Sequence, residues 1–132
     1  MDVVVDTSVI IAAIAGEARR ECLIEAVRGA DLIAPPSVHW EIGKAFSAML
    51  RRGRITLQQA LAAIEIYSAI AIRFVDVELR ESLEIARASN IYGYDAYLIR
   101  CALKYDAPLL SLDGNLLRAA KQAGVSVIEV SE

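Results

Sequence analysis

The sequence predicts an α/β fold in which a central parallel sheet of four to five short strands lies between layers of helices. Short apolar runs rich in β-branched residues alternate with longer segments of helical periodicity, which is typical of a parallel sheet covered on both faces. The 132 residues suit a single domain spanning 1–132, and a hydrophobic share of 56% is sufficient for a packed core.

Each element follows from a local signal. Apolar runs predict strands at 3–5, 32–34, 72–75, 109–112 and 127–130. Helical periodicity predicts helices that start at about 9 and then cover about 17–28, 37–51, 57–69, 76–89, 94–105 and 114–122. Asp6, Thr56 and Asp76 are the predicted caps of three of these helices, and Thr56 with Gln59 matches a capping box. In the middle of the chain, two pairs of helices therefore follow one another without a strand between them.

The composition argues against several classes of protein. A formal net charge of −3 argues against a surface that binds nucleic acid over its whole extent, although three basic residues cluster within 51–54. No segment reaches the ~20 uninterrupted apolar residues of a membrane helix, and the acidic start does not resemble a secretory signal. We therefore expect a cytoplasmic protein in which Cys22 and Cys101 are buried, reduced thiols. A single histidine makes a zinc site implausible.

Two acidic residues directly follow predicted strands. Asp6 comes after the strand at 3–5, and Asp113 comes after the strand at 109–112. Because ligands of open α/β sheets bind beyond the carboxyl ends of the strands, both carboxylates are expected at one edge. The alternative for Asp6 is a helix cap alone, and the alternative for Asp113, which precedes Gly114, is a turn or cap residue alone.

Two further acids lie on helices, with a phase that directs them toward the apolar side. At about 100° per residue, Glu41 lies about 60° from Val38, on the flank of the apolar stripe. Asp95 is in line with the stripe of the later helix, formed by Leu98, Ile99, Ala102 and Leu103. The alternatives are a surface position for Glu41 and a first-turn acid favoured by the helix dipole for Asp95. Carboxylates brought together repel one another, so a cluster of four needs a cation, and oxygen ligands select Mg²⁺ or Mn²⁺.

The ordered set of these segments resembles the PIN-domain nucleases, with a spacing similar to that of the VapC toxins of prokaryotic toxin–antitoxin pairs. The resemblance covers the whole chain and rests on the run 3–8, Glu41, the Tyr-Asp-Ala run 94–96 and the run 109–113. It implies a PIN-like three-layer sandwich, dependence on Mg²⁺ or Mn²⁺, and hydrolysis of RNA phosphodiester bonds. The implied acidic site consists of Asp6, Glu41, Asp95 and Asp113.

The resemblance also suggests roles for individual residues. Asp6 and Asp95 would bind metal directly, Glu41 would bind a second ion or orient the attacking water, and Asp113 would bind directly or through water. Thr7 or Ser8, and Ser111, match the hydroxyl positions beside the first and last acids, where they could orient carboxylates. Ordinary capping is the alternative for these hydroxyls. Many relatives carry an aromatic residue after the last acid, and here Leu116 or Leu117 is expected to take its packing place.

A nuclease must also hold a polyanion. Lys44, Arg51, Arg52 and Arg54 are candidates for a phosphate-binding rim, and a solvated helix end is the alternative. Trp40, Tyr92 and Tyr94 could stack on bases, and packing at helix ends is the alternative for them.

The resemblance to toxins suggests two protein partners. The first is an antitoxin that places a basic residue in the acidic cleft. The second is another copy of the chain, bound through the apolar helix at 57–69, because the mean hydropathy of +0.42 is high for a small monomer. A catalytically silent scaffold and a stand-alone RNA-processing nuclease are the rival functions. A haloacid-dehalogenase phosphatase fits poorly because Ser8 stands where its second Asp is needed, and a phospho-receiver domain fits poorly because 129–131 lack a Lys.

Overall fold

The computed structural model describes residues 1–16 and 20–130, and it confirms the predicted α/β class. The strands are β1 (Asp2–Val5), β2 (Asp31–Ala34), β3 (Ile72–Phe74), β4 (Leu109–Leu110) and β5 (Val127–Ile128). The helices are α1 (Thr7–Ile14), α2 (Arg20–Ala26), α3 (Ser37–Arg51), α4 (Leu57–Ala69), α5 (Leu79–Ser89), α6 (Gly93–Lys104) and α7 (Gly114–Gln122). No helix in the described ranges combines the length and apolarity needed to cross a bilayer.

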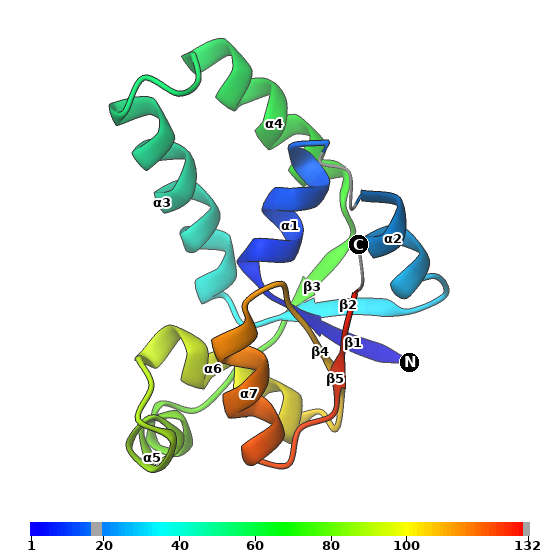
Figure 1. Ribbon diagram of the computed structural model, residues 1–132, viewed down its shortest axis with the longest axis vertical. Coiled ribbons are helices and arrows are strands. Elements are labelled where there is room, and N and C mark those ends of the chain that lie inside the picture. Colours follow the sequence, from blue (N-terminus) through cyan, green and yellow to red (C-terminus); the bar gives the residue numbers. More distant parts are fainter. Residues whose placement is uncertain (17–19, 131–132) are drawn as a thin grey trace.

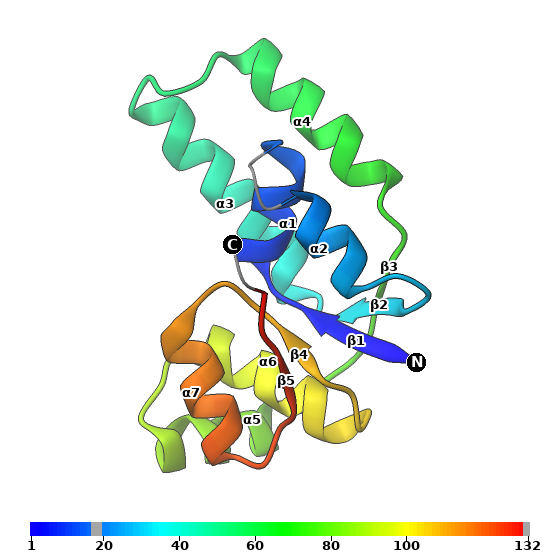
Figure 2. The same ribbon diagram turned by 45° about the vertical axis from the view of Figure 1, so that its right-hand side comes forward.

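All five strands are parallel, in the order β3-β2-β1-β4-β5. β2 and β3 are therefore added on one side of β1. After β3 the chain crosses back, and β4 and β5 are added on the other side of β1. Because parallel crossovers are right-handed, this reversal places α1 to α4 on one face and α5 to α7 on the other, as Figures 1 and 2 show. The point where the order reverses lies between β1 and β4.

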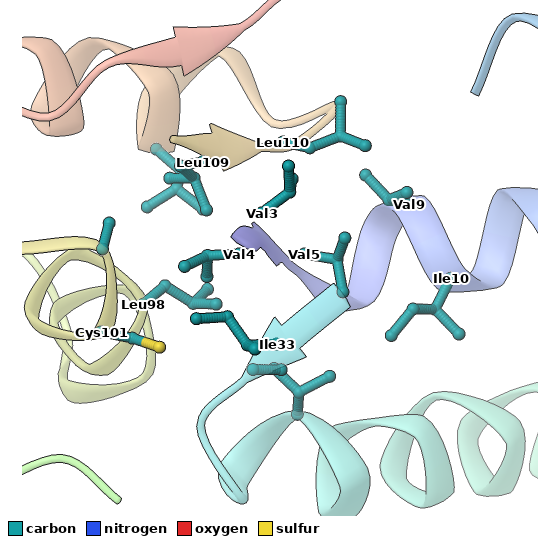
Figure 3. Packing of buried hydrophobic residues seen from close by; sticks show 14 of the residues in the cluster. Val3, Val4, Val5, Val9, Ile10, Ile33, Leu98, Cys101, Leu109 and Leu110 are labelled. Atoms are coloured by element: carbon teal, nitrogen blue, oxygen red, sulfur yellow. The ribbon is translucent and has the colours of Figure 1, made fainter. Parts of the chain in front are cut away.

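The central strand is apolar on both sides because helices cover both of its faces. Figure 3 shows Leu109 and Leu110 beside the three valines of β1, with Val9 and Ile10 of α1 at one side and Leu98 and Cys101 of α6 at the other. Val3, Val4 and Val5 are fully buried. The core thus fixes the position of the residue that follows, Asp6, at the carboxyl end of the central strand.

One predicted helix cap is wrong. Asp76 does not begin α5; the helix begins at Leu79, and Glu78 occupies the cap position with extended backbone and no side-chain bond to the helix. The segment before α5 is held instead by Lys104, the last residue of α6, and by Tyr105, which follows that helix. Lys104 and the Tyr105 hydroxyl both donate to the backbone carbonyl of Asp76. These contacts hold the backbone ahead of the helix, and the cap falls two residues later than predicted.

Other sequence expectations need smaller corrections. The last two strands are only two residues long, because their ladder pairs Leu109 with Val127 and Leu110 with Ile128 and goes no further. Leu103 is exposed rather than part of the α6 stripe, and Cys22 is exposed rather than buried, because α2 buries only Leu23. The predicted start of that helix at 17 lies outside the described residues, and its described part ends at Ala26, earlier than predicted.

Candidate active site

Asp6 lies at the carboxyl end of β1, at the point where the strand order reverses. Ligands of open α/β sheets bind at such switch points. Asp6 is 5% exposed and also begins α1, because its Oδ1 accepts a hydrogen bond of 3.3 Å from the Val9 backbone N–H. The predicted cap and the predicted position at the sheet edge are therefore both observed.

Two serine hydroxyls hold the carboxylate of Asp6. Ser8 Oγ donates to Oδ1 and Ser111 Oγ donates to Oδ2, both at 2.6 Å. Each serine oxygen in turn accepts a backbone N–H from the loop after β4: Leu112 donates to Ser8, and Asp113 donates to Ser111. Since the serine oxygens already accept these bonds, their protons are available for the carboxylate. This arrangement fixes the carboxylate plane and joins the ends of β1 and β4.

These hydrogen bonds do not outweigh the burial of Asp6. Burial raises the pKa of the Asp6 carboxyl above its usual value, the bonds from Ser111, Ser8 and the Val9 N–H oppose that rise, and the charge of Asp113 adds to it. The carboxylate is thus well oriented but incompletely compensated.

Glu41 projects from α3 toward Asp6 and Asp95, as its helical phase predicts. It is half-buried, and its Oε1 atom is buried without a hydrogen-bond partner. Burial raises the pKa of Glu41, as do the charges of Asp6 and Asp95, whereas the Thr7 hydroxyl and the Lys44 ammonium lower it. Thr7 Oγ1 lies near this carboxyl, yet it makes no hydrogen bond of good geometry. A buried carboxylate oxygen without a partner is costly unless a ligand completes it.

Asp95 and Asp113 approach from the far side of the sheet. Asp95 lies in the first turn of α6, and burial together with the charges of Asp113 and Asp6 raises its pKa. Asp113 caps α7, where its Oδ1 accepts from the backbone N–H groups of Asn115 and Leu116. Leu116 is buried behind it, whereas Leu117 is half-exposed, so Leu116 takes the packing place expected after the last acid.

The four predicted acids therefore lie within electrostatic range of one another, contributed by β1, α3, α6 and the start of α7. The donor set is rich in oxygen and suits Mg²⁺ or Mn²⁺. The partnerless Glu41 oxygen and the uncompensated carboxylates fit a divalent cation. Among residues 1–16 and 20–130, however, no three Asp, Glu, His or Cys side chains stand close enough to enclose an ion, so binding requires carboxylates to turn inward.

The predicted basic rim is divided by the structure. Lys44 lies one turn after Glu41 and its charge acts on that carboxyl. Arg51 is about 15 Å further along α3 than Glu41, because a helix rises 1.5 Å per residue, and Arg52 and Arg54 lie beyond the end of that helix. The arginines are therefore separated from the acids and cannot contact the same phosphate.

The hydrogen bonds that Ser8 and Ser111 make around Asp6 could be predicted only in part from the sequence. The sequence places the hydroxyls of Ser8 and Ser111 beside acids, but their backbone donors, the N–H groups of Leu112 and Asp113, carry no side-chain signal. Tyr94 is a second residue whose surroundings the sequence did not reveal. The Lys44 ammonium lies 6.0 Å from the centre of its ring.

Comparison with known proteins identifies a family and a set of similar folds. The model of the PIN domain family matches residues 3–122. The structure is similar to VapBC2 of Rickettsia felis, bound to a DNA fragment from its promoter, with a TM-score of 0.73, 12% identity and coverage of 99% of this chain and 100% of that one. It is also similar to PAE2754 of Pyrobaculum aerophilum, with a TM-score of 0.71, 21% identity and coverage of 96% of this chain and 92% of that one.

A third similar structure is VapC20 of Mycobacterium tuberculosis, described as a sarcin-ricin-loop-cleaving toxin. Its TM-score is 0.65 at 21% identity, with coverage of 98% of this chain and 99% of that one. At these identities the likeness concerns the fold. No curated protein matches the sequence significantly.

Proposed function

Because this chain belongs to the PIN-domain family, a family of nucleases, we propose that it is a Mg²⁺- or Mn²⁺-dependent endoribonuclease that hydrolyses RNA phosphodiester bonds. The observation that carries this proposal is the convergence of Asp6, Glu41, Asp95 and Asp113 at the switch point of the sheet, with a buried Glu41 oxygen that lacks a partner. A divalent ion bound there would polarise the scissile phosphate and lower the pKa of a coordinated water.

The residues divide into those that bind and those that orient. Asp6 and Asp95 are proposed as direct ligands, Glu41 as the ligand of a second ion or the group that orients water, and Asp113 as a ligand through its Oδ2 atom or through water. Ser8 and Ser111 keep Asp6 in one orientation through bonds of 2.6 Å. Thr7 is proposed to hold Glu41 once its carboxylate turns toward a cation.

The direct test is cleavage of purified tRNA, rRNA and mRNA by the purified chain. We expect cleavage with Mg²⁺ or Mn²⁺, no cleavage with a chelator, and none by the Asp6→Asn variant. If the wild-type chain stays inactive with both ions after any bound partner is removed, the catalytically silent scaffold is the better description.

We further propose that the chain is the cytoplasmic toxin of a toxin–antitoxin pair. The fold likeness to VapBC2 and VapC20 supports this, and so does an apolar groove between α1, α2 and α4, lined by Val9, Ile10, Leu23, Ile24 and Ile66. An antitoxin helix could lie in this groove while a basic residue binds the carboxylates. Expression of the chain alone should arrest growth, and co-expression of the adjacent small reading frame should relieve it. Harmless expression of an active enzyme would instead favour a stand-alone RNA-processing nuclease.

A homodimer that binds through α4 is also proposed, but with fewer residues of that helix in the interface than its sequence offers. Ala60 and Tyr67, two apolar residues of the helix predicted to form the dimer surface, are buried within the chain and cannot contact a second copy. Leu57 and Leu61, 61% and 57% exposed, provide the apolar surface of this helix. A light-scattering mass that stays at 14.3 kDa over a wide concentration range would refute the dimer.

A further inference from the structure

We propose that Tyr94 and Lys44 form a subsite for one unpaired nucleotide of single-stranded RNA beside the acidic cluster, with the base against the Tyr94 ring and the phosphate near the Lys44 ammonium. This inference rests on the proposed function, because it names the form in which RNA reaches that site.

The two residues border the cluster from opposite sides. Lys44 lies on α3 three residues after Glu41, and its charge lowers the pKa of that carboxyl. Tyr94 lies on α6 directly before Asp95. The Lys44 Nζ atom is 6.0 Å from the centre of the Tyr94 ring. The pair therefore spans α3 and α6 where the carboxylates of these two helices meet.

The Tyr94 ring is accessible. Tyr94 is 48% exposed. The plane of the Tyr97 ring makes an angle of 72° with that of Tyr94, with ring centres 6.1 Å apart, so Tyr97 does not stack on it. The Lys44 ammonium lies at the outer limit of the cation–π range, so its attraction to the ring is weak and a phosphate could draw it away. An incoming nucleotide could thus use both groups at once.

Trp40 and Tyr92, the other two residues that the sequence predicts to stack on bases, do not offer the same combination. Trp40 contacts the edge of His39, with ring centres 4.8 Å apart, and Tyr92 is 88% exposed. Among the contacts between cations and rings in the described residues, neither Trp40 nor Tyr92 takes part. A ring and a cation together meet the two faces of a nucleotide, its base and its phosphate. This favours Tyr94 over the other two.

The charge of the cluster supports the presence of such a subsite. Four carboxylates repel RNA until a cation binds, and Arg51, Arg52 and Arg54 are too far along the chain to hold the same nucleotide. Lys44 lies within electrostatic range of Glu41. A duplex keeps its bases stacked on one another and cannot present a free face to the tyrosine, so the subsite selects single strands.

The test measures binding of a labelled single-stranded RNA by fluorescence anisotropy, in the Asp6→Asn variant so that the RNA stays intact. An abasic position is moved along the strand. We expect one position at which loss of the base weakens binding about tenfold. With the additional substitution Tyr94→Leu this penalty should vanish, whereas Tyr94→Phe should retain it and the control Tyr92→Leu should not alter it. Lys44→Gln should reduce the salt dependence of log K by about 0.7.

Three results would overturn the subsite: equal binding of a duplex of the same sequence, an abasic penalty that survives Tyr94→Leu, or a penalty that Tyr92→Leu also removes. Each variant is melted thermally to verify that it is folded. The cleavage assay is separate. Cleavage by the wild-type chain without a Tyr94-dependent penalty refutes the subsite alone, and a Tyr94-dependent penalty without wild-type cleavage refutes the nuclease alone.

Discussion

The carboxylate of Glu78 lies beside basic side chains, whereas the carboxylates of the acidic cluster lie beside one another. Glu78 accepts hydrogen bonds from Arg100 Nε at 2.9 Å and Lys104 Nζ at 2.6 Å, and these bonds lower its pKa to about 2. Asp6, Glu41 and Asp95 are more buried, face one another, and have raised pKa values. Glu78 is neutralised by its own chain and serves the packing of α5 against α6. The cluster is left without that compensation, which is the condition expected of a site for an external cation.

The largest effect that tests this contrast is expected from Asp6→Asn. Loss of one central ligand should lower RNA cleavage at least about 100-fold while the fold survives, and Asp95→Asn should act similarly. In the metal-free protein the melting temperature should stay the same or rise, because the substitution removes a buried charge that its neighbours repel.

The matched control is Asp106→Asn. Asp106 is exposed and has a φ of 50°, a conformation that asparagine tolerates, so this variant should keep both activity and stability. Full activity of Asp6→Asn would remove Asp6 from the site.

Glu41→Gln tests the helix phase. It should reduce cleavage at least about tenfold, because the amide carries no charge for a cation or a water. Glu65→Gln on α4 is the control, since Glu65 is an exposed residue of a different helix. Initial rates of both variants at saturating Mn²⁺ decide the matter. Equal losses would mean that the face of the helix carries no information about function.

Metal addition should stabilise the wild-type chain. With Mn²⁺ at about 100 times its dissociation constant, the gain is about 2.7 kcal/mol if the ion binds the folded state alone. The measurement is the free energy of unfolding with and without Mn²⁺, in the wild type and in Asp6→Asn. A gain of the same size in both proteins would place the ion elsewhere.

The smallest effect is expected from Glu78→Gln. The folded pKa of about 2 lies below the usual value of 4.5, so the ionised Glu78 contributes stability above 4.5 that is lost as pH falls through about 2. The variant should melt slightly below the wild type at neutral pH, and the difference should close on acidification. Cleavage should stay within about twofold of the wild type. Melting curves across this pH range provide the test, and a constant difference would contradict it.

Several features of the site could be predicted because they depend on local geometry. Helical phase directed Glu41 inward, and the short strand before Asp6 placed it at the sheet edge. The predictions failed where a distant segment decides the outcome. Nothing near Asp76 in the sequence shows that Lys104 and Tyr105 hold its carbonyl, and nothing near Tyr94 shows that Lys44 lies over it. Periodicity gives the face of an element but not the element packed against it.

The bond between Ser111 Oγ and Asp6 Oδ2 joins residues 105 positions apart, and this separation bears on biosynthesis. During translation, Asp6 emerges from the ribosome early and remains without its serine partner until residue 111 has left the exit tunnel. At 5–20 residues per second, that delay is on the order of ten seconds. A nascent chain therefore carries an incomplete acidic site until β4 docks beside β1.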